Sequence, residues 1–98
     1  MAYKPKTYYV YILSNAWNTV LYVGVTNNLR RRIEEHKRGE GGVFTEKYNV
    51  HKLVYAQEFS RIDEAIRAEK LLKRGTRARK VRLIESINPG WIDMFDPE

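Results

Sequence analysis

Two strand-like runs close together near the N-terminus restrict the fold more than any other feature of the sequence. Residues 8–13 (YYVYIL) and 20–25 (VLYVGV) are rich in aromatic and β-branched side chains, which favour extended strands. Ser14 to Asn18 between them has the composition of a turn. A connection this short joins antiparallel neighbours, because a parallel pair needs a crossover of about a dozen residues or more. The chain is therefore expected to begin with a β-hairpin.

A helix and a third strand are expected next. The helix follows Thr26, with Asn27 or Asn28 as its N-cap, and runs to about Lys37, where a glycine-rich stretch stops it. The chain then forms a loop that includes Phe44 and Tyr48. The third strand covers about residues 52–59.

Two further helices complete the predicted order. Ser60 is expected to cap the first, with Asp63 at the capping-box position, and this helix runs to about Lys73. Gly75 ends it, and Thr76 starts the last helix, which reaches about Ile87 before a Pro-Gly pair. The order ββα-β-αα predicts an α+β domain, a small three-stranded antiparallel sheet with helices packed around it. The 98 residues are expected to form a single domain with a core from about 7 to 91 and short flexible ends.

The first predicted helix carries ionisable residues on the side that should be apolar. Leu29 and Ile33 mark its inward stripe, and Arg32 and His36 occupy the next positions of the same stripe. A histidine there can be a buried residue with satisfied hydrogen bonds, or part of a functional site.

The second predicted helix has the same anomaly. Its apolar stripe consists of Ile62, Ala65, Ile66 and Leu72, and Glu69 lies near the middle of it. A carboxylate seldom occupies such a position unless a cation meets it. One explanation is a buried structural ion pair between Arg32 and Glu69; the other is a functional site that uses both.

The charge distribution indicates an anionic partner. Eighteen Lys and Arg residues outnumber twelve Asp and Glu, for a net charge of +6, and many of the basic residues occur in two runs. A phosphate backbone is the obvious partner for such runs, although a solvated helix face is the alternative. The residues predicted to contact nucleic acid are Arg30, Arg31, Lys70, Lys73, Arg74, Arg77 and Lys80.

The rest of the composition excludes several classes of site. The absence of cysteine excludes disulfides, thiolate metal sites and cysteine nucleophiles. No signal peptide or membrane-spanning segment is recognisable, so a cytoplasmic protein with no membrane partner is expected.

The ordered set of motifs resembles the GIY-YIG nuclease superfamily, in particular its small stand-alone bacterial proteins. Val10-Tyr11-Ile12 and Tyr22-Val23-Gly24 are similar to the two motifs that name the family, with Val10 in place of glycine. The family arginine comes ten residues after the second tyrosine, at Arg32, and its histidine one turn later, at His36. The family glutamate corresponds to Glu69.

This resemblance implies metal-dependent hydrolysis of a phosphodiester. Glu69 would hold a single Mg²⁺ or Mn²⁺ ion, Arg32 would bind the phosphate, and Tyr11 or Tyr22 would take a proton from water. His36 would position a tyrosine or bind phosphate. Two further candidates are Tyr48 and Asn88, the latter because a late asparagine is functional in some members of the family.

The resemblance leaves two alternatives to an endonuclease open. One is a nucleic-acid-binding module that cuts little or not at all, and the other is a structural or interaction scaffold. The expected substrate is DNA rather than RNA, recognised by its structure and not by its sequence, with a role in DNA repair or recombination. The chain is expected to be a monomer or a weak dimer.

Overall fold

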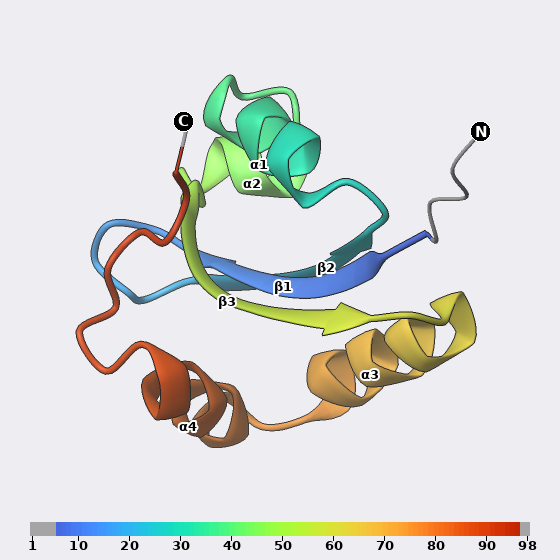
Figure 1. Cartoon of the computed structure of the whole chain (residues 1–98). Helices are drawn as coiled ribbons and strands as arrows, with labels where there is room; N and C mark the ends of the chain where they lie inside the picture. Colours follow the sequence, from blue (N-terminus) through green and yellow to red (C-terminus); the bar gives the residue numbers. More distant parts are fainter. Residues whose placement is uncertain (1–5, 97–98) are drawn as a thin grey trace.

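The computed structural model describes residues 6–96, and its centre is a three-stranded antiparallel sheet (Figure 1). The strands are β1 (Tyr8–Ser14), β2 (Leu21–Thr26) and β3 (Lys52–Phe59), in the order β2-β1-β3. The predicted hairpin and third strand are confirmed. Because β1 is central, β2 and β3 are both edge strands.

Helices cover both faces of this sheet. The helices α1 (Leu29–Lys37) and α2 (Val43–Lys47) lie on one face, and α3 (Ile62–Arg74) and α4 (Arg77–Ile87) lie on the other (Figure 1). The predicted α+β class is therefore confirmed. None of the helices within residues 6–96 is long and apolar enough to cross a membrane.

Helix α2 occupies part of the stretch predicted as a loop, and that prediction was wrong. The helix is a single turn of five residues, too short to show a helical period in the sequence. It starts after Gly42, whose φ of +139° is accessible mainly to glycine. Tertiary packing holds it, because Thr45 is buried and its carbonyl accepts a hydrogen bond from the backbone N–H of Val50 at 2.9 Å.

Two of the three helices with a predicted start, α1 and α4, have a side chain that caps their N-terminus. The side chain of Asn28 accepts from the backbone N–H of Arg31, and that of Thr76 accepts from Arg79. Helix α3 instead begins after Arg61, without a side-chain cap, so the prediction of Ser60 as the cap was wrong. The Arg61 guanidinium binds the Asp63 carboxylate at 3.1 Å, which removes Asp63 from the capping role.

Two clusters of buried side chains lie on opposite faces of the sheet. On the α3–α4 face, the cluster is mainly apolar and consists of Val10, Ile12, Val23, Val54, Tyr55, Ala65, Leu72 and Ile84. On the α1 face, it consists of Tyr11, Leu13, Ile33, Val50 and Leu53. Successive residues of β1 thus enter different environments, as the alternation of side chains along a strand requires.

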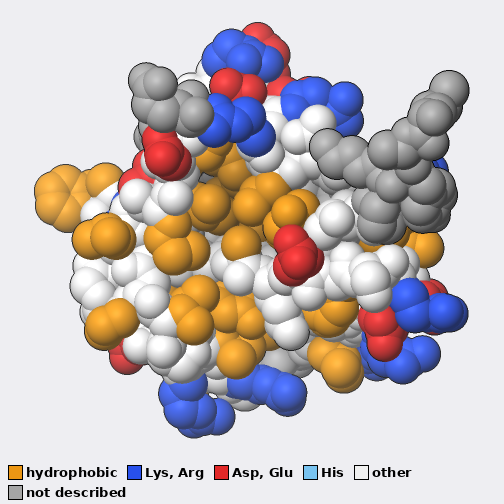
Figure 2. All heavy atoms as spheres, in the orientation of Figure 1, with side chains coloured by type: hydrophobic (Ala, Val, Ile, Leu, Met, Phe, Trp, Pro, Cys, Tyr) orange, Lys and Arg blue, Asp and Glu red, His pale blue; other side chains and the backbone are white. Residues whose placement is uncertain are grey.

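The apolar stripe predicted for α3 is buried only in part. Ala65 and Leu72 are buried, but Ile62 and Ile66 are exposed, because no segment of residues 6–96 covers that end of the helix. The surface shows the same mixture (Figure 2). Hydrophobic side chains occupy the middle of the face that carries β3, and Lys and Arg side chains gather at its margins, over α1 and below α4.

Candidate active site

Three of the predicted site residues form a ring cluster on the α1 face. The antiparallel register places Gly24 opposite Tyr11, and Tyr22, two residues from Gly24, projects from the same face. The ring centroids of Tyr11 and Tyr22 are 6.4 Å apart, and His36 lies 5.9 Å from the first and 5.6 Å from the second. The sheet and α1 therefore bring both motif tyrosines to one histidine.

Both ring nitrogens of His36 are used inside the protein. Nε2 lies 3.1 Å from the Tyr11 hydroxyl, and Nδ1 lies 3.1 Å from Thr45 Oγ1. The Thr45 hydroxyl donates its hydrogen to the carbonyl of Gly42, so its oxygen accepts a hydrogen bond from the Nδ1–H of His36. Nε2 is then the acceptor, and the Tyr11 hydroxyl donates to it. His36 is fully buried, and each ring nitrogen faces a protein hydroxyl.

The electrostatic environment keeps this pair neutral. Burial, helped by the Arg32 guanidinium, lowers the pKa of His36 from 6.5 to about 4. Burial also raises the pKa of Tyr11 from 10.0 to about 12, although the Arg32 guanidinium opposes that increase. The Tyr11 proton therefore stays on the phenol at neutral pH.

Two glycines make room for the ring cluster. A Cβ at Gly24 would collide with the hydroxyl end of the Tyr11 ring, and a Cβ at Gly41 would collide with the His36 imidazole. Both glycines are buried. The approach of each ring to the backbone therefore depends on the missing side chain.

Arg32 is held beside the cluster and partly reaches solvent. Its Nη1 donates to the Glu35 carboxylate at 3.0 Å and its Nη2 donates to the Gly41 carbonyl at 2.9 Å. About a third of its side chain (32%) is exposed. A guanidinium has five N–H donors, so Arg32 retains donors for a further anion.

Glu69 belongs to α3, in the helical layer on the opposite face of the sheet. Its carboxylate is 3.4 Å from the Lys73 ammonium, and its side chain is only 16% exposed. Burial is the main cause of the raised pKa of Tyr11, and the Glu69 charge adds to it. Within residues 6–96, Arg32 forms an ion pair with Glu35, and Glu69 forms one with Lys73. The buried Arg32–Glu69 pair that a structural scaffold would use is therefore not formed.

A hollow at the edge of β2 connects the two helical layers. It has a volume of about 280 Å³ and is lined by Leu21, Tyr22, Val23, Phe44, Lys73 and Lys80. Tyr22 and Phe44 come from the α1–α2 side, and the two lysines come from α3 and α4. The partner of Glu69 and the second motif tyrosine therefore line one open, basic groove.

The other residues predicted to contact nucleic acid are dispersed. Arg77 donates to the carbonyls of Asn18 and Thr19 and so binds the hairpin turn. The Arg30 guanidinium lies over the Phe95 ring and borders a separate hollow beside Tyr9. The remaining members of the predicted set are exposed, namely Arg31, Lys70 and Arg74.

The two additional candidates have different positions. Tyr48 is 42% exposed, and its ring packs on Phe44 with a centroid distance of 4.8 Å. Asn88 is buried away from this cluster. Its Nδ2 donates to the carbonyls of Val54 and Ile92, so it anchors the end of α4 and does not line the groove.

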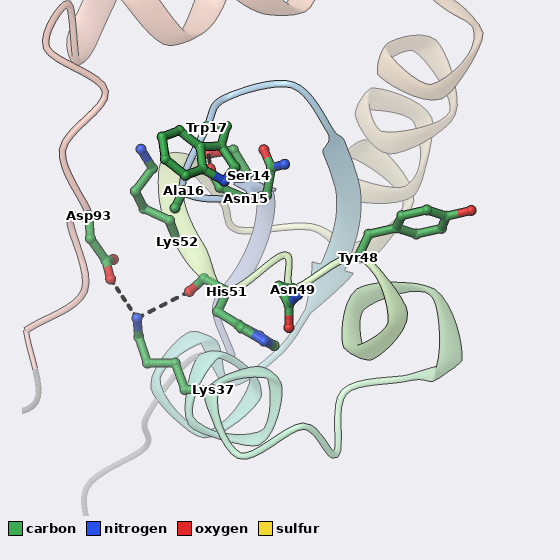
Figure 3. A pocket seen from close by; sticks show the side chains of 10 residues that line it. All are labelled: Ser14, Asn15, Ala16, Trp17, Lys37, Tyr48, Asn49, His51, Lys52 and Asp93. Atoms are coloured by element: carbon green, nitrogen blue, oxygen red, sulfur yellow. Dashed lines mark hydrogen bonds and ion pairs between the residues drawn. The ribbon is translucent and has the colours of Figure 1, made fainter.

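A second hollow lies away from the two motif tyrosines. It has a volume of about 500 Å³, and Figure 3 shows the residues that line it between the β1–β2 turn and the C-terminal segment. Lys37 crosses it and donates to the Asp93 carboxylate and to the carbonyl of His51 (Figure 3). The lining contains none of Tyr11, Tyr22, Arg32 and Glu69, so volume does not identify the candidate site.

The sequence patterns did not identify Thr45, Phe44, Gly24 or Gly41 as members of the candidate site. Thr45 and Phe44 lie in the short helix that was predicted as a loop. Gly24 belongs to the second strand motif, but its contact with Tyr11 depends on strand register. The cluster of glycines before α2 was a usable signal, because glycine often marks a close approach of backbone to another group.

Comparisons with known proteins agree with the motif pattern. The family model for the GIY-YIG catalytic domain matches residues 7–82, a range that contains Tyr11, Tyr22, Arg32, His36 and Glu69 but not Asn88. A UPF0213 protein of Natronomonas pharaonis is 40% identical over 77 residues, which cover 79% of this chain and 89% of that protein. A UPF0213 protein of Streptococcus agalactiae is 38% identical over 77 residues, which cover 79% and 86%.

A solved structure shows the same fold. The solution NMR structure of the UPF0213 protein BH0048 from Bacillus halodurans matches with a TM-score of 0.54 and 33% sequence identity. The match covers 86% of this chain and 87% of the other. The arrangement of sheet and helices described above is therefore that of an experimentally determined relative.

Proposed function

Because this chain belongs to the GIY-YIG catalytic-domain family, we propose that it is a divalent-metal-dependent endonuclease that hydrolyses phosphodiester bonds in nucleic acid. The observation that carries this proposal is that Tyr11, Tyr22 and His36, from three different elements, pack together, and that Tyr22 lines an open groove with Lys73, the partner of Glu69. The cations of the groove, Lys73 and Lys80, suit phosphates, and phosphate contacts carry no sequence information. Cleavage is thus proposed to be structure-directed, as in DNA repair or recombination.

Arg32 is proposed to bind the phosphate that is cut. The Glu35 carboxylate and the Gly41 carbonyl fix its guanidinium, and about a third of its side chain (32%) is exposed to solvent. A fixed guanidinium can bind two phosphate oxygens with parallel hydrogen bonds. It would neutralise the charge that develops on those oxygens as water attacks.

A single Mg²⁺ or Mn²⁺ ion suits the residues present. No group of three or more His, Asp, Glu or Cys side chains that could hold a metal occurs within residues 6–96, so an all-protein metal cage is excluded for that range. Mg²⁺ often takes only one or two carboxylates and completes its shell with waters and substrate phosphates. Glu69 would supply that carboxylate, and the ion would stabilise the leaving oxygen.

The two tyrosines can serve the proton transfer in different ways. The Tyr11 hydroxyl is buried and donates to His36, so it can accept a proton from water only as its own proton passes to Nε2. Tyr22 lines the open groove, where water can reach it. The cleavage rates of Tyr11→Phe and Tyr22→Phe can be compared, with Arg32 intact in both. The tyrosine whose replacement lowers the rate more is then identified as the base.

The decisive experiment compares Glu69→Gln with the wild-type protein. Purified protein is incubated with nicked, duplex, branched and single-stranded DNA and with RNA, with Mg²⁺, with Mn²⁺ and with EDTA. Wild type is expected to cleave only with metal, and Glu69→Gln is expected to lose about a thousandfold or more in rate. Its fold should persist, because the Glu69–Lys73 pair is a partly exposed pair worth about 1 kcal/mol or less.

Glu64→Gln is the matched control, because Glu64 is an exposed acid on the same helix. It should cleave as wild type does. Equal cleavage by wild type and Glu69→Gln would contradict the catalytic role of Glu69.

One observation favours a second candidate function, a nucleic-acid-binding module without cleavage. Lys73 is paired with Glu69, the only carboxylate proposed for the metal, and so competes with an ion for it. Binding with a steep salt dependence and no metal-dependent cleavage of any substrate would support this alternative.

A further inference from the structure

A run of three aromatic rings leads from the candidate site onto α2. The ring centroids of Tyr22 and Phe44 are 6.1 Å apart, and those of Phe44 and Tyr48 are 4.8 Å apart. We call these three residues the aromatic run. Phe44 is 44% exposed and Tyr48 is 42% exposed, so both rings offer surface to solvent.

The outer rings of the aromatic run are held in place by buried contacts. Thr45, next to Phe44, is buried and bonded to His36, and its carbonyl accepts from Val50. Tyr48 ends α2, with its backbone N–H bonded to the Phe44 carbonyl. In Figure 3, Tyr48 points away from the other side chains that line the large hollow. The two rings are therefore preorganised, although neither is fully buried in the core.

Cationic side chains accompany the aromatic run at both ends. Lys73 and Lys80 line the β2-edge groove together with Tyr22 and Phe44. At the far end, the Lys47 ammonium lies 5.4 Å from the centroid of the Tyr48 ring. Surfaces that bind single-stranded nucleic acid combine two elements. Aromatic rings stack with the bases, and cationic side chains beside them bind the phosphates.

We propose that the aromatic run binds unpaired nucleotides, with bases stacked on Phe44 and Tyr48 and phosphates against Lys73 and Lys80. This inference rests on the proposed function, because the unpaired nucleotides would belong to the strand next to the phosphate that Arg32 would bind. Bases inside a duplex are stacked on each other and cannot stack on a side chain without being unpaired. The substrate class is therefore nucleic acid with an unpaired segment, either a single strand or a branch.

The test is a binding titration that needs no cleavage. Fluorescence anisotropy is measured in EDTA with a labelled single strand of about 12 nucleotides, a blunt duplex and a forked duplex. The wild-type protein is expected to bind the single strand and the fork about tenfold more tightly than the blunt duplex. Phe44→Leu keeps an apolar side chain but removes the ring, and should weaken single-strand binding by about tenfold.

Two controls separate ring stacking from other causes. Val43 lies on the same helix and is 85% exposed, and Val43→Ala should bind every substrate as wild type does. Tyr48→Phe keeps the ring and should bind normally, whereas Tyr48→Ala should lose about tenfold. Thermal unfolding of each variant shows whether a loss of binding comes from a loss of fold.

The outcomes distinguish this inference from the proposed function. Equal affinity for single strand and duplex, or normal binding by folded Phe44→Leu and Tyr48→Ala, would overturn the inference even if the protein is an active nuclease. Weakening by Val43→Ala but not by Phe44→Leu would show that the rings are not the nucleic-acid contact and would also overturn it. Ring-dependent binding by a protein that cuts nothing would support the inference and contradict the proposed function.

Discussion

The two faces of the sheet are covered by different kinds of core. Against α3 and α4, Val10 and Ile12 join a cluster that is held mainly by apolar packing. Against α1 and α2, Tyr11 lies in a chain of buried hydrogen bonds that includes His36 and Thr45. Apolar packing is non-directional and tolerates change, whereas a buried polar chain works only if every partner is satisfied. We infer that the α3–α4 face mainly stabilises the fold, whereas the α1–α2 face fixes the position of the Tyr11 ring.

The largest expected effect is a loss of stability on the apolar face. Ile84→Ala removes a fully buried side chain of α4 and should lower the free energy of unfolding by about 2–5 kcal/mol. Cleavage per folded molecule should stay within about twofold of wild type, because the cluster that holds Ile84 contains none of the residues predicted to be catalytic. Urea denaturation and a cleavage assay below the midpoint measure the two quantities. Ile92→Ala, on the surface, is the control and should change stability by about 0.5 kcal/mol or less.

The next effect is a loss of activity from the polar face. Gly24→Ala adds a methyl group that collides with the end of the Tyr11 ring and should displace the ring by about an ångström. A displacement of that size costs about a hundredfold in rate. Gly90→Ala is the matched control, since a Cβ there meets only an ordinary contact with Ile92. If Gly24→Ala cleaves as fast as Gly90→Ala, Tyr11 has no demanding geometric role.

The pH dependence of stability should also come from the polar face. The pKa of His36 is lowered by burial from 6.5 to about 4, so the unfolded chain binds a proton at higher pH than the folded chain does. The stabilisation is fully present above pH 6.5 and is lost as the pH falls toward 4. Wild type should lose about 2 kcal/mol across that window relative to His36→Gln. Thermal midpoints of the two proteins between pH 7.5 and 4.5 measure this difference, and parallel curves would contradict it.

The smallest expected effect concerns the tautomer of His36. Thr45→Val removes the acceptor of the Nδ1 proton and should cost about 1–2 kcal/mol, whereas Thr45→Ser keeps the hydroxyl and should cost less. Nitrogen NMR of the imidazole should show the proton on Nδ1 in the wild type and in Thr45→Ser, but on Nε2 in Thr45→Val. A wild-type proton on Nε2 would reverse the direction of the Tyr11–His36 hydrogen bond and remove the asymmetry between the two faces.

Much of the fold could be predicted from local patterns. The hairpin, α1 with Asn28 as its cap, β3 and α4 with Thr76 as its cap follow from side-chain alternation, helical period and capping chemistry. These signals act between residues a few positions apart, so they do not depend on the rest of the molecule. The single turn of α2 was missed because its helical conformation is held by the burial of Thr45 and by the hydrogen bond from Val50, which no local pattern reveals.

Only part of the candidate site could be predicted from the sequence. The helical wheel placed Arg32 and His36 on the inward side of α1 and Glu69 near the middle of the apolar stripe of α3. It could not show that His36 is fully buried with both nitrogens bonded, nor that Ile62 and Ile66 are exposed. A wheel tells which residues share a face, but only the neighbouring segments decide whether that face is covered.

The sequence by itself determined the strands, most of the helices, the basic charge and the motif residues of the GIY-YIG family. Only the tertiary structure decided that Tyr22 and Lys73, the partner of Glu69, line one groove, and that Phe44 continues the line of rings from Tyr22. The reason is physical. Secondary structure depends on interactions between near neighbours in the chain, whereas burial, pKa and the meeting of side chains depend on segments that are distant in sequence and become adjacent only when the two layers of helices close on the sheet.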